Sequence, residues 1–138
     1  MSSLDTMIPL AREAMRRAYA PYSKFPVGAC LRTDGGRFYA AANVENAAYP
    51  QGQCAEASAI GMMVAGGDLR IVEVVVMGGT PGDGMLCTPC GGCRQKLAEF
   101  GRHDTPVLLA TTEGATLATT VGELLPGRFD AGHMAKAE

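Results

Sequence analysis

The sequence contains no long run of apolar residues. A membrane-spanning helix needs about 18 or more consecutive apolar residues, whereas the longest largely apolar stretch, "RIVEVVVMGG" at 70–79, has the length of a buried strand. Charged residues interrupt the apolar positions of the N-terminal stretch "MSSLDTMIPLAREAMRR", which therefore does not resemble a signal peptide. We expect a cytoplasmic protein that has no membrane partner.

Neither sign of charge is in large excess. Lysine and arginine total 12 and aspartate and glutamate total 14, which gives a formal net charge of −2 and a pI near 5.7. A protein that binds a phosphate backbone usually carries a basic patch or a high pI, so this balance argues against a nucleic-acid polymer as the main partner. A small or neutral ligand fits the composition better.

Internal repeats, linkers and low-complexity segments are also missing from the sequence. At 138 residues, 47% of them hydrophobic, residues 1–138 are expected to form a single domain. Only the tail at 130–138, "DAGHMAKAE", is predicted to be loosely held. The sequence has two histidines, His103 in an expected loop and His133 in this tail, and we assign neither a functional role.

Hydrophobic periodicity predicts a helix followed by a β-hairpin. Apolar residues near the N-terminus recur at intervals of four and three, as on one face of a helix: Leu4, Ile8, Ala11, Met15 and Ala18. Pro9 would be tolerated in the first turn of that helix, and Pro21 lies beyond its end. Residues 24–33 and 37–44 alternate in polarity around the turn signal "DGG", which predicts a β-hairpin.

The rest of the chain alternates between predicted helices and strands. Residues 53–66 and 90–101 are typical of helices that end at glycine. Strands are predicted at 70–77, 105–112 and 115–120, and a short helical turn follows them. This order implies a mixed sheet with helices packed on its faces.

Three of the five cysteines occupy positions suited to binding one metal ion. Cys90 and Cys93 lie three residues apart at a predicted helix start, so both side chains can share one face, and Cys54 begins another helix. Helix N-termini favour thiolates, the form of cysteine that binds metal. Three thiolates leave the fourth tetrahedral position of Zn²⁺ open, as in a catalytic site. Glu56 would then be the nearby proton carrier.

The same cysteines allow other interpretations. Cys87, Cys90 and Cys93 begin like an iron–sulfur motif, but Leu97 stands where the fourth cysteine would be. Cys54 together with these three could instead close a structural zinc site, which would leave Glu56 without a function.

A redox role for the CxxC motif is less favoured, because Pro89 and the paired glycines do not resemble the thioredoxin setting. Cys30 lies within a predicted strand and is interpreted as a small core residue.

Five sequence blocks occur in an order and spacing that resemble the zinc-dependent cytidine deaminases. They are "YAPYSKFPVGA" at 19–29, "NVENAAY" at 43–49, "CAE" at 54–56, "PCGGCRQ" at 89–95 and "LLPGRF" at 124–129. The resemblance implies a three-layer α/β/α fold with a five-stranded mixed sheet, assembled as a homotetramer. It also implies hydrolytic deamination of free cytidine and deoxycytidine to uridine and deoxyuridine, a reaction of pyrimidine salvage, with one Zn²⁺ per chain.

The resemblance also implies a role for individual residues. Cys54, Cys90 and Cys93 match the zinc ligands, and Glu56 matches the proton shuttle between water and the pyrimidine. The backbone of Ala55 matches a donor to the pyrimidine carbonyl.

Four further positions match substrate contacts of the family. Asn43 and Glu45 match residues that bind the ribose; their spacing at a strand end allows both to face a crevice, although a simple turn would also explain them. Phe25 matches an aromatic beside the nucleoside, and Phe129 matches one that reaches a neighbouring subunit's site. Without the resemblance, both phenylalanines would be read as core residues.

The sequence departs from the family at Ala57, where arginine is common after "CAE", and in the loop "YPQGQ" at 49–53. Because an arginine there could donate to the thiolates, we expect Arg94 or Gln53 to supply that donor instead. Blasticidin S deaminases share "CAE" and the "PCGxC" pattern and commonly lack that arginine, so they are the alternative enzyme. A noncatalytic zinc-stabilised domain is the alternative from another class.

Overall fold

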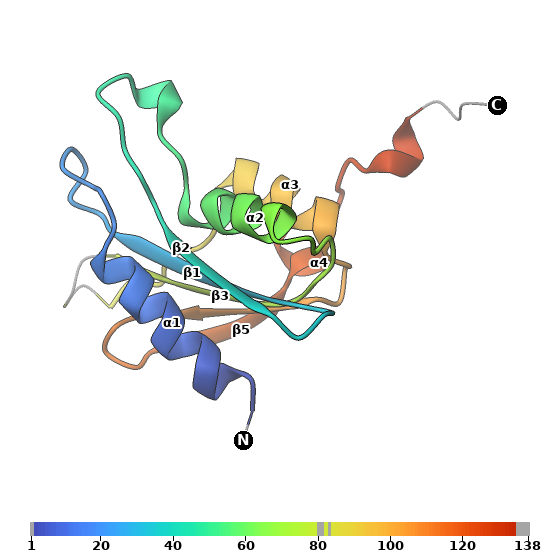
Figure 1. The fold of residues 1–138 in the computed structure, drawn as a ribbon, viewed down its shortest axis with the longest axis horizontal. Helices are drawn as coiled ribbons and strands as arrows, with labels where there is room; N and C mark the ends of the chain where they lie inside the picture. Colours follow the sequence, from blue (N-terminus) through green and yellow to red (C-terminus); the bar gives the residue numbers. More distant parts are fainter. Residues whose placement is uncertain (1, 80–81, 83, 135–138) are drawn as a thin grey trace.

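A five-stranded sheet forms the centre of the protein, as seen in a computed structural model that describes residues 2–79, 82 and 84–134 (Figure 1). The strand order is β2-β1-β3-β4-β5. β3 and β4 are parallel and the other neighbouring pairs are antiparallel, so the predicted mixed sheet is confirmed. The strands are β1 (Val27–Thr33), β2 (Phe38–Ala42), β3 (Ile71–Gly78), β4 (Pro106–Ala110) and β5 (Thr116–Thr120).

Helices cover both faces of this sheet and complete the three layers (Figure 1). One face carries α1 (Leu4–Arg16), and the other carries α2 (Ala55–Ala65), α3 (Gly91–Phe100) and the short α4 (Val121–Leu124). Two single turns of 3-10 helix, η1 (Tyr49–Gln51) and η2 (Ala131–His133), lie outside these layers. Within the described residues, no helix has the length and apolar character needed to span a membrane.

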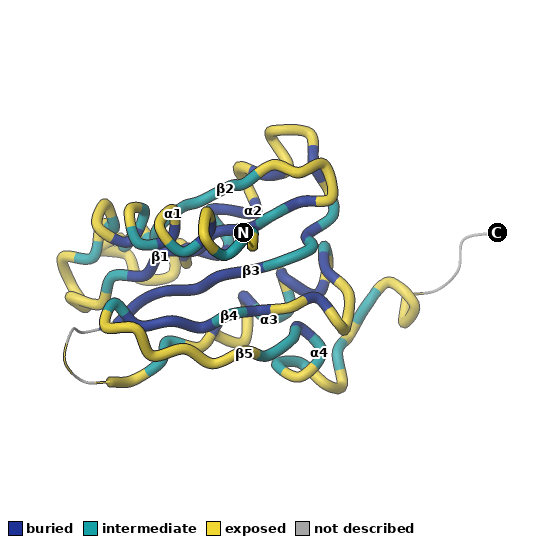
Figure 2. The backbone as a smooth tube through the Cα atoms, turned by 90° about the horizontal axis from the view of Figure 1, so that it is seen from below, coloured by how far each residue is buried: buried dark blue, intermediate teal, exposed yellow. Residues whose placement is uncertain are grey.

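The central strands contribute to a hydrophobic core on each side of the sheet. Alternate side chains of β3 point to opposite faces, so Val74 and Val76 pack toward α2 and α3 whereas Val75 and Met77 pack toward α1. Figure 2 shows this burial along β1, β3 and β4, while β5 stays largely exposed at the sheet edge. Cys30 is fully buried in the core beneath α1, which confirms its interpretation as a core residue.

The position of Pro9 differs from the prediction. It is the sixth residue of α1 and lies in the second turn, not the first. Because proline has no N–H, the helical hydrogen bond to the carbonyl of Asp5 cannot form. The buried side chains of Met7, Ala11 and Met15 hold the helix against the sheet, and this packing outweighs the lost hydrogen bond.

Gly28 allows α1 to lie directly on β1. A Cβ atom at this position would be 2.1 Å from the carbonyl oxygen of Ala11 and 2.7 Å from the amide nitrogen of Met15. Since both are backbone atoms, neither can rotate away. We expect Gly28→Ala to lower the free energy of unfolding by about 2 kcal/mol or more, measured by urea and thermal denaturation.

Gly127→Ala is the matched control, because no atom lies within 4 Å of the Cβ it would add. Its free energy of unfolding should match that of the wild type. A Gly28→Ala variant as stable as this control would show that α1 can move off β1 without loss.

The tail predicted from Asp130 onward contains η2. The side chain of Asp130 accepts a hydrogen bond from the amide of Gly132, and Nδ1 of His133 accepts one from the amide of Asp130. Residues 131–134 are exposed, and residues 135–138 of the predicted tail lie outside the described residues.

Candidate functional site

Three cysteines meet where α2 and α3 begin. Cys54 is the N-cap of α2, Cys90 is the N-cap of α3, and Cys93 lies in the first turn of α3. The three sulfur atoms lie within 4.8 Å of one another, and Sγ of Cys54 is 3.7 Å from Sγ of Cys90. Two sulfurs bound tetrahedrally to one Zn²⁺ at about 2.3 Å lie about 3.8 Å apart. The donor set and its spacing therefore fit a zinc ion.

Cys87 does not join this group. Its Sγ lies 3.9 Å from the carbonyl oxygen of Thr88, and burial, together with the negative charge of Glu56, raises the pKa of its thiol to about 11. Among the residues that the structure describes, the candidate metal ligands are Cys54, Cys90 and Cys93 alone. The geometry thus favours an open three-thiol site over the closed four-thiol alternative.

The three thiols compete for ionisation, because a negative charge on one disfavours ionisation of the others. Burial raises the pKa of Cys93, and the charges of Glu56 and Cys54 raise it further. Burial also raises the pKa of Cys54. At Cys90, burial acts in the same direction, but hydrogen bonds from the Cys93 backbone and from the other two thiols outweigh it and lower the pKa. A bound cation would remove this competition, because it stabilises all three thiolates at once.

Glu56 places a carboxyl group beside the sulfurs. It is the second residue of α2 and only 3% exposed. Burial raises the pKa of Glu56, and hydrogen bonds from its own backbone amide and from the Cys93 side chain offset part of that rise. A carboxyl group with a raised pKa can accept and release a proton near neutral pH, which suits the predicted proton carrier.

A cavity of about 350 Å³ is lined by Glu56 and by two of the three cysteines, Cys54 and Cys90. It brings together seven of the predicted site residues: Phe25, Asn43, Glu45, Cys54, Ala55, Glu56 and Cys90. Sequence reasoning assigned no substrate role to four other residues that line it, Ser23, Val27, Cys87 and Thr88. Ser23 and Val27 fall within the block 19–29 that carries the family resemblance, so the signal was present there.

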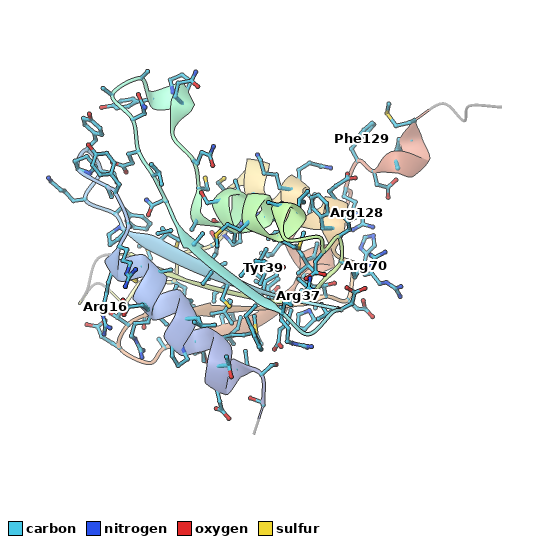
Figure 3. The ribbon with its side chains drawn as sticks, in the orientation of Figure 1. Arg16, Arg37, Tyr39, Arg70, Arg128 and Phe129 are labelled. Carbon is cyan, nitrogen blue, oxygen red and sulfur yellow. The ribbon has the colours of Figure 1, made fainter. Side chains whose placement is uncertain are left out.

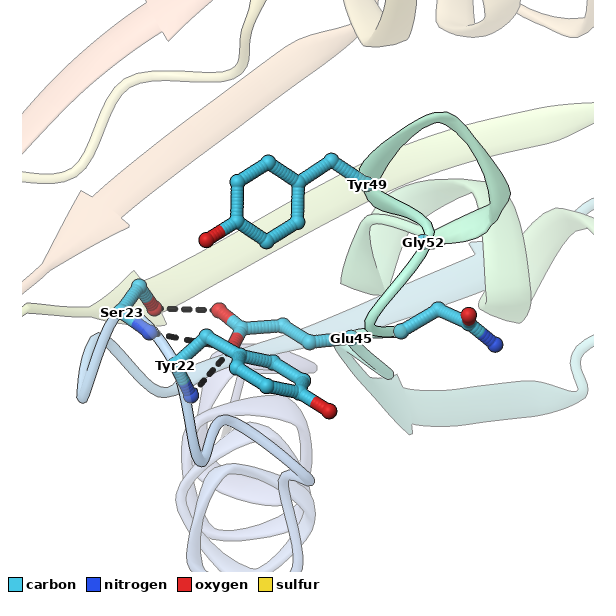
Figure 4. A pocket seen from close by; sticks show the side chains of 6 residues that line it. Tyr22, Ser23, Glu45, Tyr49 and Gly52 are labelled. Carbon is cyan, nitrogen blue, oxygen red and sulfur yellow. Dashed lines mark hydrogen bonds between the residues drawn. The ribbon is translucent and has the colours of Figure 1, made fainter.

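Asn43 and Glu45 both line the cavity, and their side chains hydrogen-bond to the loop before β1. Oδ1 of Asn43 accepts from the amide of Val27 at 2.9 Å, and its Nδ2 donates to the carbonyl of Phe25 at 3.0 Å. One carboxylate oxygen of Glu45 accepts from the amides of Tyr22 and Ser23 at 3.0 and 3.1 Å, and the other accepts from the Ser23 hydroxyl (Figure 4). Residues 43–46 form no turn, and Val44 pairs in extended bridges with Tyr19 and Gln53, so the structural role of these side chains is to hold the loop at 22–27.

Glu45 and Ser23 line a second hollow as well as this cavity. The second hollow has a volume of about 370 Å³ and lies between Tyr22 and Tyr49, whose rings meet edge to face with centroids 6.1 Å apart (Figure 4). None of the three cysteines lines this hollow. Cys54, Cys90 and Glu56 line the first cavity and not the second.

Phe129 is the one predicted substrate contact that lies away from the cavity. It is 56% exposed and sits on the C-terminal segment that extends from the body of the protein (Figure 3). Its ring stacks on His133 with centroids 5.2 Å apart, and its carbonyl accepts from Nε2 of Gln95 at 2.7 Å. This position suits a side chain that reaches outward, and His133, to which the sequence assigned no role, supports it.

Arg94 does not donate to the cysteine sulfurs, contrary to prediction. Its Nε donates to the carbonyl of Pro89 at 2.7 Å, and its Nη1 donates to the carbonyl of Leu124 at 2.9 Å. The guanidinium therefore joins the loop before Cys90 to the end of α4. The other predicted donor, Gln53, is within 3.4 Å of the Ser58 hydroxyl, from which its side-chain oxygen accepts.

Known proteins resemble this chain over nearly its whole length. Residues 1–109 match the family described as the cytidine and deoxycytidylate deaminase zinc-binding region. A cytidine deaminase of Sporosarcina psychrophila is 40% identical over 126 residues, which cover 91% of this chain and 90% of that protein. A probable cytidine deaminase of Dictyostelium discoideum is 35% identical over 136 residues, or 98% of this chain and 90% of the relative.

Solved structures agree with these sequence matches. The crystal structure of cytidine deaminase from Burkholderia pseudomallei has a TM-score of 0.84 and 38% identity, covering 94% of this chain and all of that one. The structure of cytidine deaminase from Mycobacterium leprae has a TM-score of 0.76 and 38% identity, covering 91% and 99%. The predicted three-layer fold and the resemblance read from the sequence are both confirmed.

Proposed function

Because the chain belongs to the cytidine deaminase family of zinc-dependent hydrolases, we propose that it converts free cytidine and deoxycytidine to uridine and deoxyuridine. The observation that carries this proposal is the placement of buried Glu56 beside three sulfurs at the end of a nucleoside-sized cavity. A cytoplasmic location and a role in pyrimidine salvage stay predictions from the sequence.

We assign the zinc ion to Cys54, Cys90 and Cys93. When bound, zinc supplies a water molecule whose pKa is lowered to about 7, so that a nucleophile is present at neutral pH. The three side chains fix the ion at the N-terminal ends of two helices, whose positive ends stabilise the thiolates.

The cavity binds and orients the nucleoside. Phe25 offers an aromatic surface to the base or the sugar, and its backbone is fixed through Asn43. Glu45 keeps further acceptor capacity for a sugar hydroxyl beyond the hydrogen bonds it receives from Tyr22 and Ser23. The amide of Ala55, in the first turn of α2, has no acceptor within the helix and can donate to the pyrimidine carbonyl.

Glu56 moves the protons of the reaction. Its carboxylate accepts a proton from the attacking water as the oxygen adds to C4, and it delivers that proton to N3 of the ring. It then takes the remaining hydroxyl proton and passes it to the departing amino group, which leaves as ammonia. Burial suits Glu56 to both steps, because it brings the carboxyl pKa nearer to neutrality.

The experiment that tests this function is a comparison of substrates. Purified protein with its zinc content measured should release ammonia from cytidine and deoxycytidine, and less or none from cytosine and blasticidin S. Preferred turnover of blasticidin S would favour the alternative deaminase. Stoichiometric zinc without ammonia from any of the four would favour a noncatalytic zinc-stabilised domain.

We further propose a homotetramer in which Phe129 completes the site of a neighbouring subunit. The exposure of Phe129 away from its own cavity supports this assembly, and so do the apolar side chains of Met62 and Val64, which are 48% and 44% exposed on α2. Phe129→Ala should then raise KM for cytidine several-fold with zinc content unchanged. An active monomer, detected by sedimentation during turnover, would rule out this role.

A further inference from the structure

A groove that shares Cys54 and Cys90 with the nucleoside cavity lies between α2 and α3. It has a volume of about 410 Å³, and the three cysteines line it together with Gly52 and Gln53 before α2, Ala57 and Gly61 of α2, and Lys96 of α3. Ala57 and Gly61 carry a methyl group and a hydrogen atom, so neither can hydrogen-bond to a sulfur. Lys96 brings a charged side chain to the same groove.

The side chain of Lys96 runs back along α3, so its ammonium group lies toward the N-terminal end of this helix, where Cys90 and Cys93 lie. A Cβ atom added at Gly92 would lie 3.6 Å from Nζ of Lys96, so the side chain reaches back one turn. A helix N-terminus carries partial positive charge and disfavours a cation. Across residues 2–79, 82 and 84–134, no carboxylate forms an ion pair with Lys96 that would explain this placement.

The zinc site supplies the missing negative charge. Three thiolates around one divalent ion carry a net charge of −1, and the two helix ends offset only part of it. Arg94 donates from Nε to the carbonyl of Pro89 and from Nη1 to the carbonyl of Leu124, and it does not line the groove. Lys96 is thus the cationic side chain that shares the groove with all three sulfurs.

We propose that Lys96 is a positioning residue that compensates the negative charge of the Cys54, Cys90 and Cys93 ligand set and so strengthens zinc binding. The inference rests on the zinc site of the proposed function. It requires only the charge of Lys96 and no direct bond to the metal. Salt should therefore weaken the effect, because mobile ions screen a charge at the protein surface.

The test measures zinc affinity in the purified full-length protein by competition with a chromophoric chelator. At low salt, Lys96→Gln should weaken zinc binding by about threefold to tenfold, as expected for one charge near an exposed site. The difference between the variant and the wild type should shrink at about 0.5 M salt, where the Debye length is only a few ångströms and the charge of Lys96 is largely screened. Lys96→Arg restores the charge and should bind zinc within about twofold of the wild type.

Arg102→Gln is the matched control, since it removes one positive charge beyond the opposite end of α3. It should leave zinc affinity unchanged. Unchanged affinity in Lys96→Gln, an equal loss at both salt concentrations, or an equal loss in Arg102→Gln would each overturn the proposal. If the wild type binds zinc but deaminates no substrate, the proposed function fails, while the comparison of zinc affinities still decides the role of Lys96.

Discussion

Replacing Glu56 with glutamine should reduce the turnover of cytidine by about 10²-fold or more. Glutamine keeps the size and polarity of glutamate but cannot accept the proton of the attacking water or return it to the ring and the leaving amino group. Release of ammonia under saturating cytidine measures the loss. Zinc content should stay at the wild-type level, because the three sulfurs that form the metal site are untouched.

Stability provides the control for this variant. Burial raises the pKa of Glu56, so the Glu56 carboxyl group holds its proton more tightly in the folded protein than in the unfolded chain. The free energy of unfolding of the wild type therefore falls as the pH rises above the ordinary carboxyl pKa. Glutamine at position 56 does not ionise, so the variant does not lose this stability. Above this pH, Glu56→Gln should unfold at a temperature no lower than the wild type. Near-normal turnover in a folded, zinc-loaded variant would remove Glu56 from the mechanism.

Replacing Cys90 with serine should remove most of the bound zinc and the activity with it. A serine hydroxyl is not ionised at neutral pH and does not replace a thiolate as a zinc ligand. The remaining sulfurs of Cys54 and Cys93 form an incomplete site. Zinc per chain, measured after dialysis against a chelator, gives the direct readout, and the melting temperature should fall because the ion stabilises the folded state.

Cys87→Ser is the matched substitution. Cys87 lines the nucleoside cavity but lies outside the group of three sulfurs, so this variant should keep one zinc per chain. Any change in activity should appear in KM. If Cys87→Ser loses zinc as completely as Cys90→Ser does, the metal site has four protein ligands and the open coordination position does not exist.

The spacing of residues along the chain determined where the reactive side chains would stand on local structure. Glycines and polarity patterns placed helices at 53–66 and 90–101, and the observed helices Ala55–Ala65 and Gly91–Phe100 put Cys54 and Cys90 at their N-caps. Cys93 and Glu56 then follow within the first turn of each helix. Such features depend on neighbours within a few residues, and for that reason a sequence can report them.

Tertiary structure decided which of these residues meet. Cys54 and Cys90 are 36 positions apart in the chain, yet their sulfurs lie 3.7 Å from each other. α2 leads into β3 and α3 leads into β4. Because these two strands are parallel, both helices begin at the same end of the strands. The family resemblance implied this meeting, but the residue pattern alone left both the three-thiol and the four-thiol arrangements open.

Long side chains depend most on the tertiary structure. Arg94 and Lys96 are two residues apart on α3, and of these two Arg94 was the one predicted from the sequence to donate to the sulfurs. Packing places the carbonyls of Pro89 and Leu124 within reach of Arg94 and leaves Lys96 in the groove with the cysteines. A flexible cationic side chain takes its position from the acceptors and charges around it, and those are gathered from distant parts of the chain only when it folds.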